Sequence, residues 1–166
     1  MAYGVVRTDN MAGTDVRGQL VSVEYMGSDG ATATAIENGN VLLLDGLKTG
    51  EREIYVGAAT AVDSPLEKVV LVASPELMYD ERKIALDEFI NPAGYPARGY
   101  HIHPGDTFSV TADAITGSPA VGYAVELAAG TKLKAVASAT NGSTQVGTII
   151  EVDATGGYTY YVIKVG

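Results

Sequence analysis

Short runs of apolar and β-branched residues, each bounded by Gly, Pro, Asn or Asp, recur along most of this chain. Such runs predict β-strands, because successive side chains of a strand point to opposite faces. Their spacing of about ten residues is typical of an antiparallel barrel or sandwich and not of an alternating α/β domain. We expect strands in QLVSVEYM, TATAIE, VLLL, EREIYVGA, EKVVLVAS, TFSVTAD, GYAVELAAG, TKLKAVAS, GTIIEVDA and YTYYVIKV.

Two of these segments carry a more specific prediction. EKVVLVAS is apolar on both faces, so we expect a central strand there. Asn38-Gly39 is a hairpin signal, because a type I′ turn needs positive φ at both central positions. We therefore expect residues 32–37 and 41–44 to pair across this turn.

Residues 74–97 interrupt the strand pattern and carry the helix signals of the chain. Ser74 can cap a helix, Pro75 suits the first helical position, and Glu76 suits the positive helix start. Three apolar residues further on have a short helical spacing: Leu86, Phe89 and Ile90. We expect one or two short helices in this excursion between strands.

Residues 1–18 are polar and rich in glycine, with little periodicity, which predicts an extended N-terminal arm. One interpretation is a frayed chain end. The other is an arm that lies on a partner. The apolar residues Tyr3, Val5 and Val6 slightly favour the arm, since a purely solvated tail would not need them.

Together these patterns predict a mainly β protein: an antiparallel barrel or sandwich with an extended N-terminal arm and one or two short helices in a mid-chain excursion. We expect the arm over residues 1–18 and a β domain over 19–166. The domain has a possible sub-division into 19–73 and 98–166, around the helical excursion 74–97.

Composition narrows the classes of chemistry and of partner that this chain can have. Of the 166 residues, 46% are hydrophobic and 19% are charged, which is typical of a chain with a packed core. The absence of cysteine excludes disulfides, thiol nucleophiles and cysteine-ligated metals. The formal net charge is −9, with no Lys/Arg cluster, so we expect no nucleic-acid partner. The start of the sequence lacks a signal-peptide layout, and no apolar run approaches a membrane span of about 18 residues, so we expect no membrane partner.

The stretch RGYHIHPGD contains both histidines, His101 and His103. In a strand they would share one face and could share a metal ion, as such pairs do in cupin barrels. A cupin site also needs a nearby Glu and a third His, and this chain has neither. Asp106 could complete a two-His, one-carboxylate site, but Pro104-Gly105 predicts an intervening turn. We expect a short strand over Gly99–His103 and then a turn, with no metal and no cofactor. The alternative is a metal-dependent or small-ligand-binding β-barrel using His101 and His103.

Other catalytic patterns are equally incomplete. The sequence has no G-x-S-x-G elbow and no phosphate-binding glycine motif. A glycosidase-type carboxylate pair stays open, yet Asp80, Glu81, Asp87 and Glu88 are typical of the solvated sides of short helices. We therefore expect no enzyme. The tyrosines of the last strand, Tyr158, Tyr160 and Tyr161, indicate either ordinary packing or an interface.

Two stretches resemble the head decoration proteins of tailed bacteriophages, also called capsid stabilising or cement proteins. They are VVRTDNMAGTDVRGQLVSVEY and VVLVASPELMYDERKIALDEFINPAGYPARGYHIHPGDTFSVTADAI, and the likeness continues through VGYAVELAAGTKLKAVAS. The resemblance implies a non-enzymatic protein that binds assembled shells at symmetry-related positions, often as a trimer, and resists the pressure of packaged DNA.

The resemblance sets the remaining expectations. The partner would be the major capsid protein, with the chain a homo-oligomer, a trimer by preference. It would be made in the bacterial cytoplasm and end on the outer capsid surface of the virion. The arm would lie along the shell, and the expected capsid contacts are Tyr3, Val5, Val6, Arg7, Asp9, Asn10 and Arg17. Another virion β module, of the tail or baseplate, is a further alternative.

Overall fold

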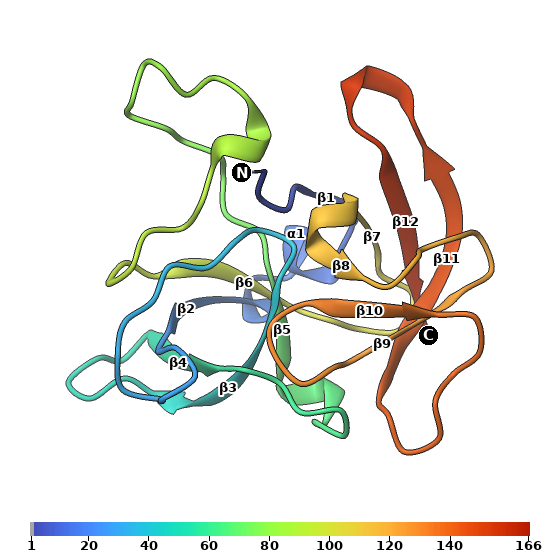
Figure 1. Ribbon diagram of the computed structural model, residues 1–166. Coiled ribbons are helices and arrows are strands. Elements are labelled where there is room, and N and C mark those ends of the chain that lie inside the picture. The colour runs from blue at the N-terminus through green and yellow to red at the C-terminus, as the bar shows by residue number, and fades with distance from the viewer. Residues whose placement is uncertain (1) are drawn as a thin grey trace.

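The structure is a computed structural model that describes residues 2–166, except for the side chains of Asp15 and Arg17. Two sheets pack side by side (Figure 1). One is a closed barrel, in the order β2 (Leu20–Tyr25), β4 (Ile54–Ala58), β3 (Val41–Leu47), β5 (Val69–Val72) and β6 (Ala97–His101). The other has seven strands, in the order β1 (Val6–Asn10), β7 (Thr107–Val110), β12 (Tyr160–Val165), β11 (Gln145–Asp153), β9 (Ala124–Glu126), β10 (Leu133–Val136) and β8 (Ile115–Thr116).

Helices are few and short, so the prediction of a mainly β fold with a barrel is confirmed. The α-helix α1 covers Ala12–Asp15, and single 3-10 turns cover Arg17–Gln19, Leu66–Lys68, Leu86–Glu88, Ala112–Ala114 and Thr155–Gly157. The strand pairs are antiparallel apart from β2 with β4 and β8 with β10, which are parallel. Sequence patterns do not reveal these two parallel pairs, because a strand's periodicity is the same in either direction.

Strand β5 connects the two halves of the core and is buried on both faces. It lies between β3 and β6, so the prediction of a central strand is confirmed. Val70 and Val72 point into the barrel, where they pack in a cluster with Val23. Val69 and Leu71 point the other way, into a larger cluster shared with the seven-stranded sheet. The two sheets therefore bury apolar surface against each other as well as internally, which stabilises them as one unit.

The predicted hairpin at Asn38-Gly39 is wrong. Strand β3 pairs with β4 and β5, while Ile36 forms only an isolated bridge with Asn91. Gly39 has a φ of +83°, but no non-glycine residue has positive φ over the described chain, so the turn is not type I′. The physical reason is the buried Asn38 amide, which bonds to the backbone of Ser74 and so directs the chain across the molecule.

The excursion contains one short helix, the 3-10 turn Leu86–Glu88. Ser74 and Pro75 do not begin a helix, because Asn38 engages both backbone polar groups of Ser74. Strand β6 pairs with β2 and β5 in the barrel, so the passage from barrel to second sheet comes after His101 and not at the excursion. Residues 75–96, hereafter the projecting loop, connect β5 to β6, and the middle part of this loop stands away from the barrel (Figure 1).

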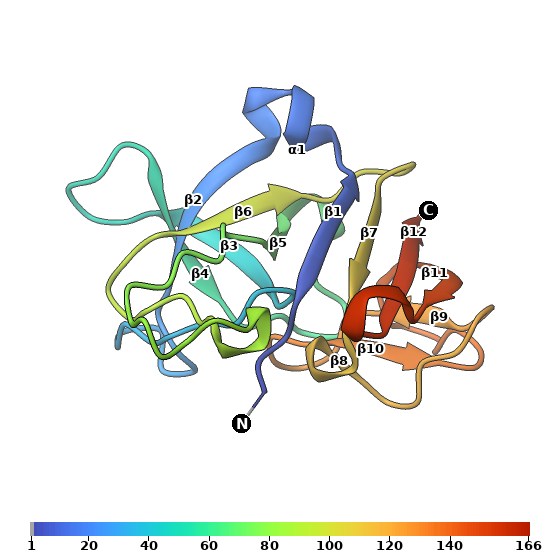
Figure 2. The same ribbon diagram turned by 90° about the horizontal axis from the view of Figure 1, so that it is seen from above.

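The N-terminal segment is extended over Val6–Asn10 but is integrated into the domain. Strand β1 pairs with β7 as the outermost strand of its sheet and lies beside the barrel (Figure 2). Met11, at the end of this strand, is 1% exposed. The apolar residues of the segment therefore fill the protein's own core.

Candidate interaction surface

Two of the predicted capsid contacts are buried. Val5 is 2% and Val6 is 8% exposed, and Val6 belongs to the cluster between the sheets. The backbone N–H of Val5 donates a hydrogen bond to the Thr111 hydroxyl at 3.1 Å. These side chains offer no surface to a partner, which corrects this part of the prediction.

Arg7 and Asp9 lie in a charged network on the outer side of β1. The Arg7 guanidinium is 2.9 Å from the Asp153 carboxylate and 3.3 Å from that of Asp9, and it stacks 4.2 Å above the Tyr160 ring. Hydrogen bonding to Asp153 raises the pKa of Arg7. Hydrogen bonds from Thr155, with a further one from Arg7, lower the pKa of Asp153 to about 2. The Arg7 charge is therefore neutralised within the protein.

The three remaining predicted capsid contacts are Tyr3, Asn10 and Arg17, and the structure describes the side chains of the first two. Tyr3 is half-buried, and its backbone N–H donates to the Asp87 carbonyl at 2.9 Å, so residue 3 touches the projecting loop. Asn10 is exposed at the end of β1. The side chain of Arg17 lies outside the described residues.

The histidine segment forms the predicted turn and a strand that is shifted from the predicted bounds, because it covers Ala97–His101 instead of Gly99–His103. Strand β6 ends at His101, and the backbone N–H of Asp106 closes a Pro104-Gly105 turn onto the His103 carbonyl at 3.0 Å. Gly105 has a φ of +95°, the conformation that glycine supplies at the third position of a type II turn.

The two imidazoles lie side by side, with ring centroids 6.4 Å apart. Burial, and then the neighbouring His103 charge, lower the pKa of His101. His103 shares a hydrogen bond with the Gln19 side chain. Asp106 is buried and accepts backbone hydrogen bonds from His103 and Ala12, both at 2.9 Å, so this carboxylate holds backbone in place. Over residues 2–166 no cluster of three or more His, Asp or Glu side chains suits a metal ion.

The tyrosines of the last strand are mainly packing residues. Tyr160 is buried beneath Arg7, and Tyr161 packs partly against the core between the sheets. The Tyr158 hydroxyl donates to the Asp87 carboxylate at 3.2 Å. Asp87 therefore receives bonds from both the N-terminal segment and the β11–β12 hairpin, and so anchors the base of the projecting loop.

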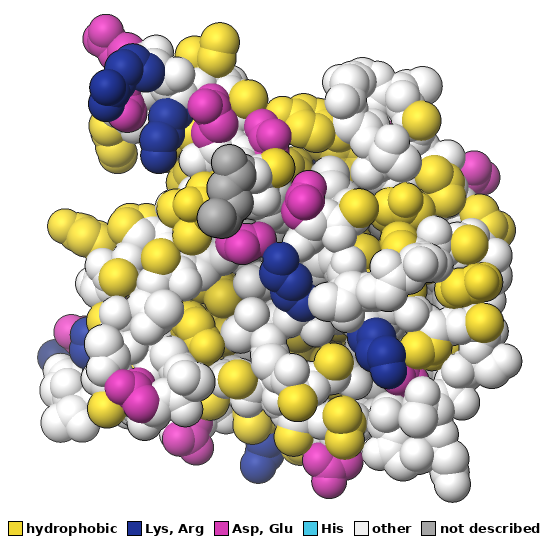
Figure 3. Space-filling view, in the orientation of Figure 1, with side chains coloured by type: hydrophobic (Ala, Val, Ile, Leu, Met, Phe, Trp, Pro, Cys, Tyr) yellow, Lys and Arg dark blue, Asp and Glu magenta, His cyan; other side chains and the backbone are white. Residues whose placement is uncertain are grey.

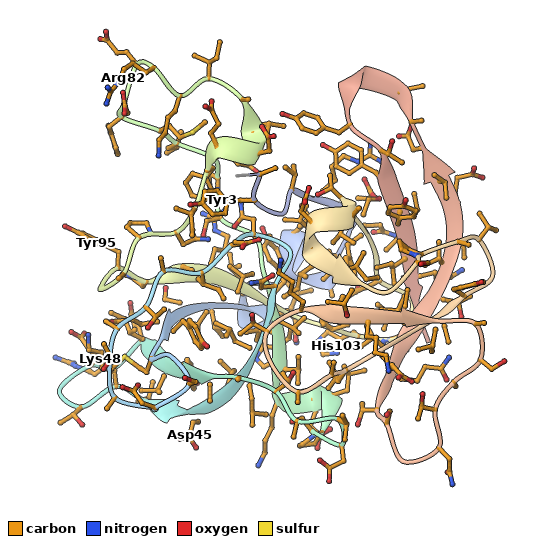
Figure 4. All side chains as sticks on the ribbon, in the orientation of Figure 1. Tyr3, Asp45, Lys48, Arg82, Tyr95 and His103 are labelled. Atoms are coloured by element: carbon orange, nitrogen blue, oxygen red, sulfur yellow. The ribbon has the colours of Figure 1, made fainter. Side chains whose placement is uncertain are left out.

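The largest exposed apolar side chains gather on the projecting loop. Tyr79 is 97%, Ile84 is 86% and Leu77 is 68% exposed, and Tyr95 near its base is also 68% exposed. Hydrophobic and charged side chains stand together over the loop at the upper left of Figure 3. Figure 4 shows Arg82 at the tip and Tyr95 directed outward from the barrel. Exposed apolar side chains that gather in one place are a recognised feature of interaction surfaces, whereas singly exposed ones are ordinary.

Sequence patterns do not predict this surface, because residues 74–97 carry helix signals. A helix would have turned Leu86, Phe89 and Ile90 into one buried stripe. In the structure Phe89 is buried at 8% exposure while Leu86 is 39% exposed. The sequence does contain a signal of exposure. The apolar residues of this segment before position 85 are interspersed with charged residues and do not recur at the period of a helix or a strand.

Acidic side chains give the tip a defined shape. One Glu88 carboxylate oxygen accepts hydrogen bonds from the backbone N–H groups of Ile84 at 2.9 Å and Ala85 at 3.0 Å. Asp80 accepts from the backbone N–H and the guanidinium of Arg82, and these bonds lower the pKa of Asp80. Asp80 and Glu88, predicted as solvated helix sides, therefore stabilise a loop instead, while Glu81 is exposed.

A hollow of about 260 Å³ lies along the loop. It is lined by Leu77, Met78, Tyr79, Asp80, Lys83, Glu88, Phe89, Ile90 and Pro92. Beyond the hollow, Asn91 is buried and exchanges backbone hydrogen bonds with Ile36 at 2.9 and 3.1 Å. The loop thus has a fixed base and an exposed apolar tip.

Comparisons with protein-family models, with curated proteins and with solved structures found no match for this chain. None of the helices in the described part of the chain has the length and apolar character needed to cross a membrane.

Proposed function

We propose that this chain is a non-enzymatic structural protein of a phage virion, which binds the outer surface of the capsid and stabilises it. The observation that carries the proposal is the projecting loop, whose tip holds Leu77, Tyr79 and Ile84 largely exposed. Leaving such side chains in water forgoes the free energy of burying them, which a partner surface would recover. The resemblance to head decoration proteins selects a capsid as that partner.

The segments that carry the resemblance contribute strands to both sheets of the fold. They contain β1, β2, β5, β6, β7, β9, β10 and the projecting loop. In this group β1 pairs with β7, and β6 pairs with both β2 and β5. The likeness therefore covers strands of both sheets together with the exposed surface of the projecting loop, which supports the proposed role for this surface.

In this proposal the partner is the major capsid protein, and the chain binds as a homo-oligomer, a trimer, on the outside of the virion. Repeated contacts on a shell raise the effective concentration of each further contact. Modest individual contacts then suffice for stable attachment. The net charge of −9 accords with a position away from the packaged nucleic acid.

Co-sedimentation tests the proposal. The full chain is mixed with shells of its own phage that lack it, and bound protein is measured in the pellet against salt concentration. We expect saturable binding and a higher temperature of shell disruption. Absence of binding by the folded chain would overturn the proposal. The full chain is needed, because deletion of residues 1–18 would remove β1 from the sheet. Electron microscopy of particles carrying labelled protein distinguishes binding to the head from binding to the tail or baseplate.

The histidine pair favours a second candidate, a β-barrel that binds a metal or a small ligand. His101 and His103 lie on the same side of the chain, with ring centroids 6.4 Å apart. Elemental analysis of protein purified without chelator tests this function. Stoichiometric metal that is lost in a His101→Ala/His103→Ala variant would support it, and metal-free wild-type protein would contradict a resident metal.

A further inference from the structure

We propose that the tip of the projecting loop, residues 77–84, is the docking element, and that it fits an apolar recess rimmed by lysine or arginine side chains. This inference rests on the proposed function for the identity of the partner, the major capsid protein. It moves the contact from the N-terminal segment, where the resemblance placed it, to a part of the chain with exposed side chains.

The first argument is the contrast in burial between the two segments. Val5 and Val6 fill the protein's own core, and the Arg7 charge is paired with Asp153. Tyr79 and Ile84, in contrast, have 97% and 86% of their surface exposed. A docking segment needs free apolar surface at its centre, and the loop tip provides it.

The second argument is that the tip is already shaped for binding. Glu88 holds the backbone N–H groups of Ile84 and Ala85, and Asp80 holds that of Arg82. A further turn hydrogen bond joins the Lys83 N–H to the Asp80 carbonyl at 2.9 Å. These backbone groups therefore need no partner, and binding would cost little backbone conformational entropy.

The third argument is the charge around the tip. Within residues 77–84 the charges balance, Asp80 and Glu81 against Arg82 and Lys83, while three further acidic residues, Glu76, Asp87 and Glu88, flank the tip in the sequence and make the loop as a whole acidic. Asp80 neutralises Arg82 through a 3.0 Å ion pair. A second copy of this chain would bring a like-charged loop, on a protein of net charge −9, against the first. Complementarity favours a basic rim on a different protein.

Serine substitutions test the apolar part. The full chain carrying Leu77→Ser, Tyr79→Ser and Ile84→Ser is compared with a matched control carrying Leu47→Ser, Val62→Ser and Val121→Ser. The control sites are also exposed, at 50%, 45% and 58%. Both variants should keep the wild-type circular dichroism and melting temperature. We expect the loop variant to bind phage shells about tenfold more weakly or worse, and the control to bind like wild type.

Charge reversal tests the rim. Glu81→Lys in the loop is compared with Glu51→Lys, an exposed site between β3 and β4. We expect Glu81→Lys to slow association with the shells and to weaken the salt dependence of binding. Glu51→Lys should leave the association rate and the salt dependence of binding unchanged. Equal behaviour of the two variants would contradict a basic rim around the docking site.

The outcomes separate the two proposals. If wild-type protein does not bind shells, the proposed function fails, and the docking assignment that rests on it fails too. If wild type binds and the loop variant binds equally well, the function stands and the docking inference is overturned. Sedimentation velocity gives the third outcome: a loop variant that loses wild-type self-association would make a second copy the occupant, and would also overturn the inference.

Discussion

The Arg7 guanidinium and the Asp153 carboxylate form a 2.9 Å ion pair across 146 positions of the sequence. Arg7 lies on β1 and Asp153 ends β11, so the contact fastens the first strand of the chain to the β11–β12 hairpin. The Tyr160 ring beneath the guanidinium completes the contact. The N-terminal strand is therefore held by charge and stacking as well as by its ladder with β7.

The charge of Asp153 should make stability depend on pH. Its folded-state pKa of about 2 lies below the ordinary 3.8, so the unfolded chain takes up a proton first as pH falls. This stabilisation is complete above about pH 4 and is lost toward pH 2. We expect Asp153→Asn to melt below wild type near neutral pH, with the difference shrinking in acid.

Thermal melts between pH 2 and 6 measure this effect, with Asp63→Asn as the control at an exposed site on another loop. A constant difference between wild type and Asp153→Asn across the range would show that the carboxylate charge contributes nothing.

The buried amide of Asn38 should be essential for the fold. It donates to the Ser74 carbonyl at 2.8 Å and accepts from the Ser74 N–H and the Asn91 amide, both at 3.0 Å. Asn38→Ala would leave these groups unpaired in a site where Asn38 is 1% exposed. We expect a loss of about 2–4 kcal/mol in the free energy of unfolding, measured by urea titration. The exposed Asn141→Ala should change it by less than about 0.5 kcal/mol.

Gly147 should tolerate no side chain, although it lies in the middle of strand β11. A Cβ there would meet the carbonyl oxygen of Lys164 at 2.1 Å, closer than any relaxed contact. We expect Gly147→Ala to destabilise the protein by about 3 kcal/mol or more, since backbone must move. Gly18 has open space around its Cβ position and no positive φ, so Gly18→Ala should be nearly neutral. Equal urea midpoints for the two variants would contradict this packing.

His101 should make the protein less stable in mild acid. Burial, together with the adjacent His103, lowers its folded-state pKa below the ordinary 6.5. Stability from the neutral ring is complete above that value and is lost as pH falls through the lowered pKa, because the unfolded chain binds the proton more readily. An NMR titration of the imidazole protons measures the effect directly. His101 titrating at or above the ordinary value would contradict the burial seen here.

Local patterns predicted the strands well, because alternation and turn residues act over a few positions. The sequence predicts strands in the segments that form β2, β3, β4, β5, β6, β7, β9, β10, β11 and β12. The Pro104-Gly105 turn was also expected, since proline and glycine restrict the backbone locally. Strand β8, only two residues long, had too little sequence to form a pattern.

Long-range contacts determined the parts of the fold that local sequence patterns do not predict. Asn38-Gly39 has the local chemistry of a hairpin, but a buried amide bonded to Ser74 outweighs it. The segment before it makes one bridge to Asn91, and β1 pairs with β7 about a hundred positions away. The exposure of the apolar residues at the tip of the projecting loop is likewise a result of tertiary structure, because the folded core buries other apolar residues and leaves these in solvent. Pairing and burial are properties of the assembled chain, because they depend on which distant segments compete for the same partner, and periodicity along the sequence does not record that competition.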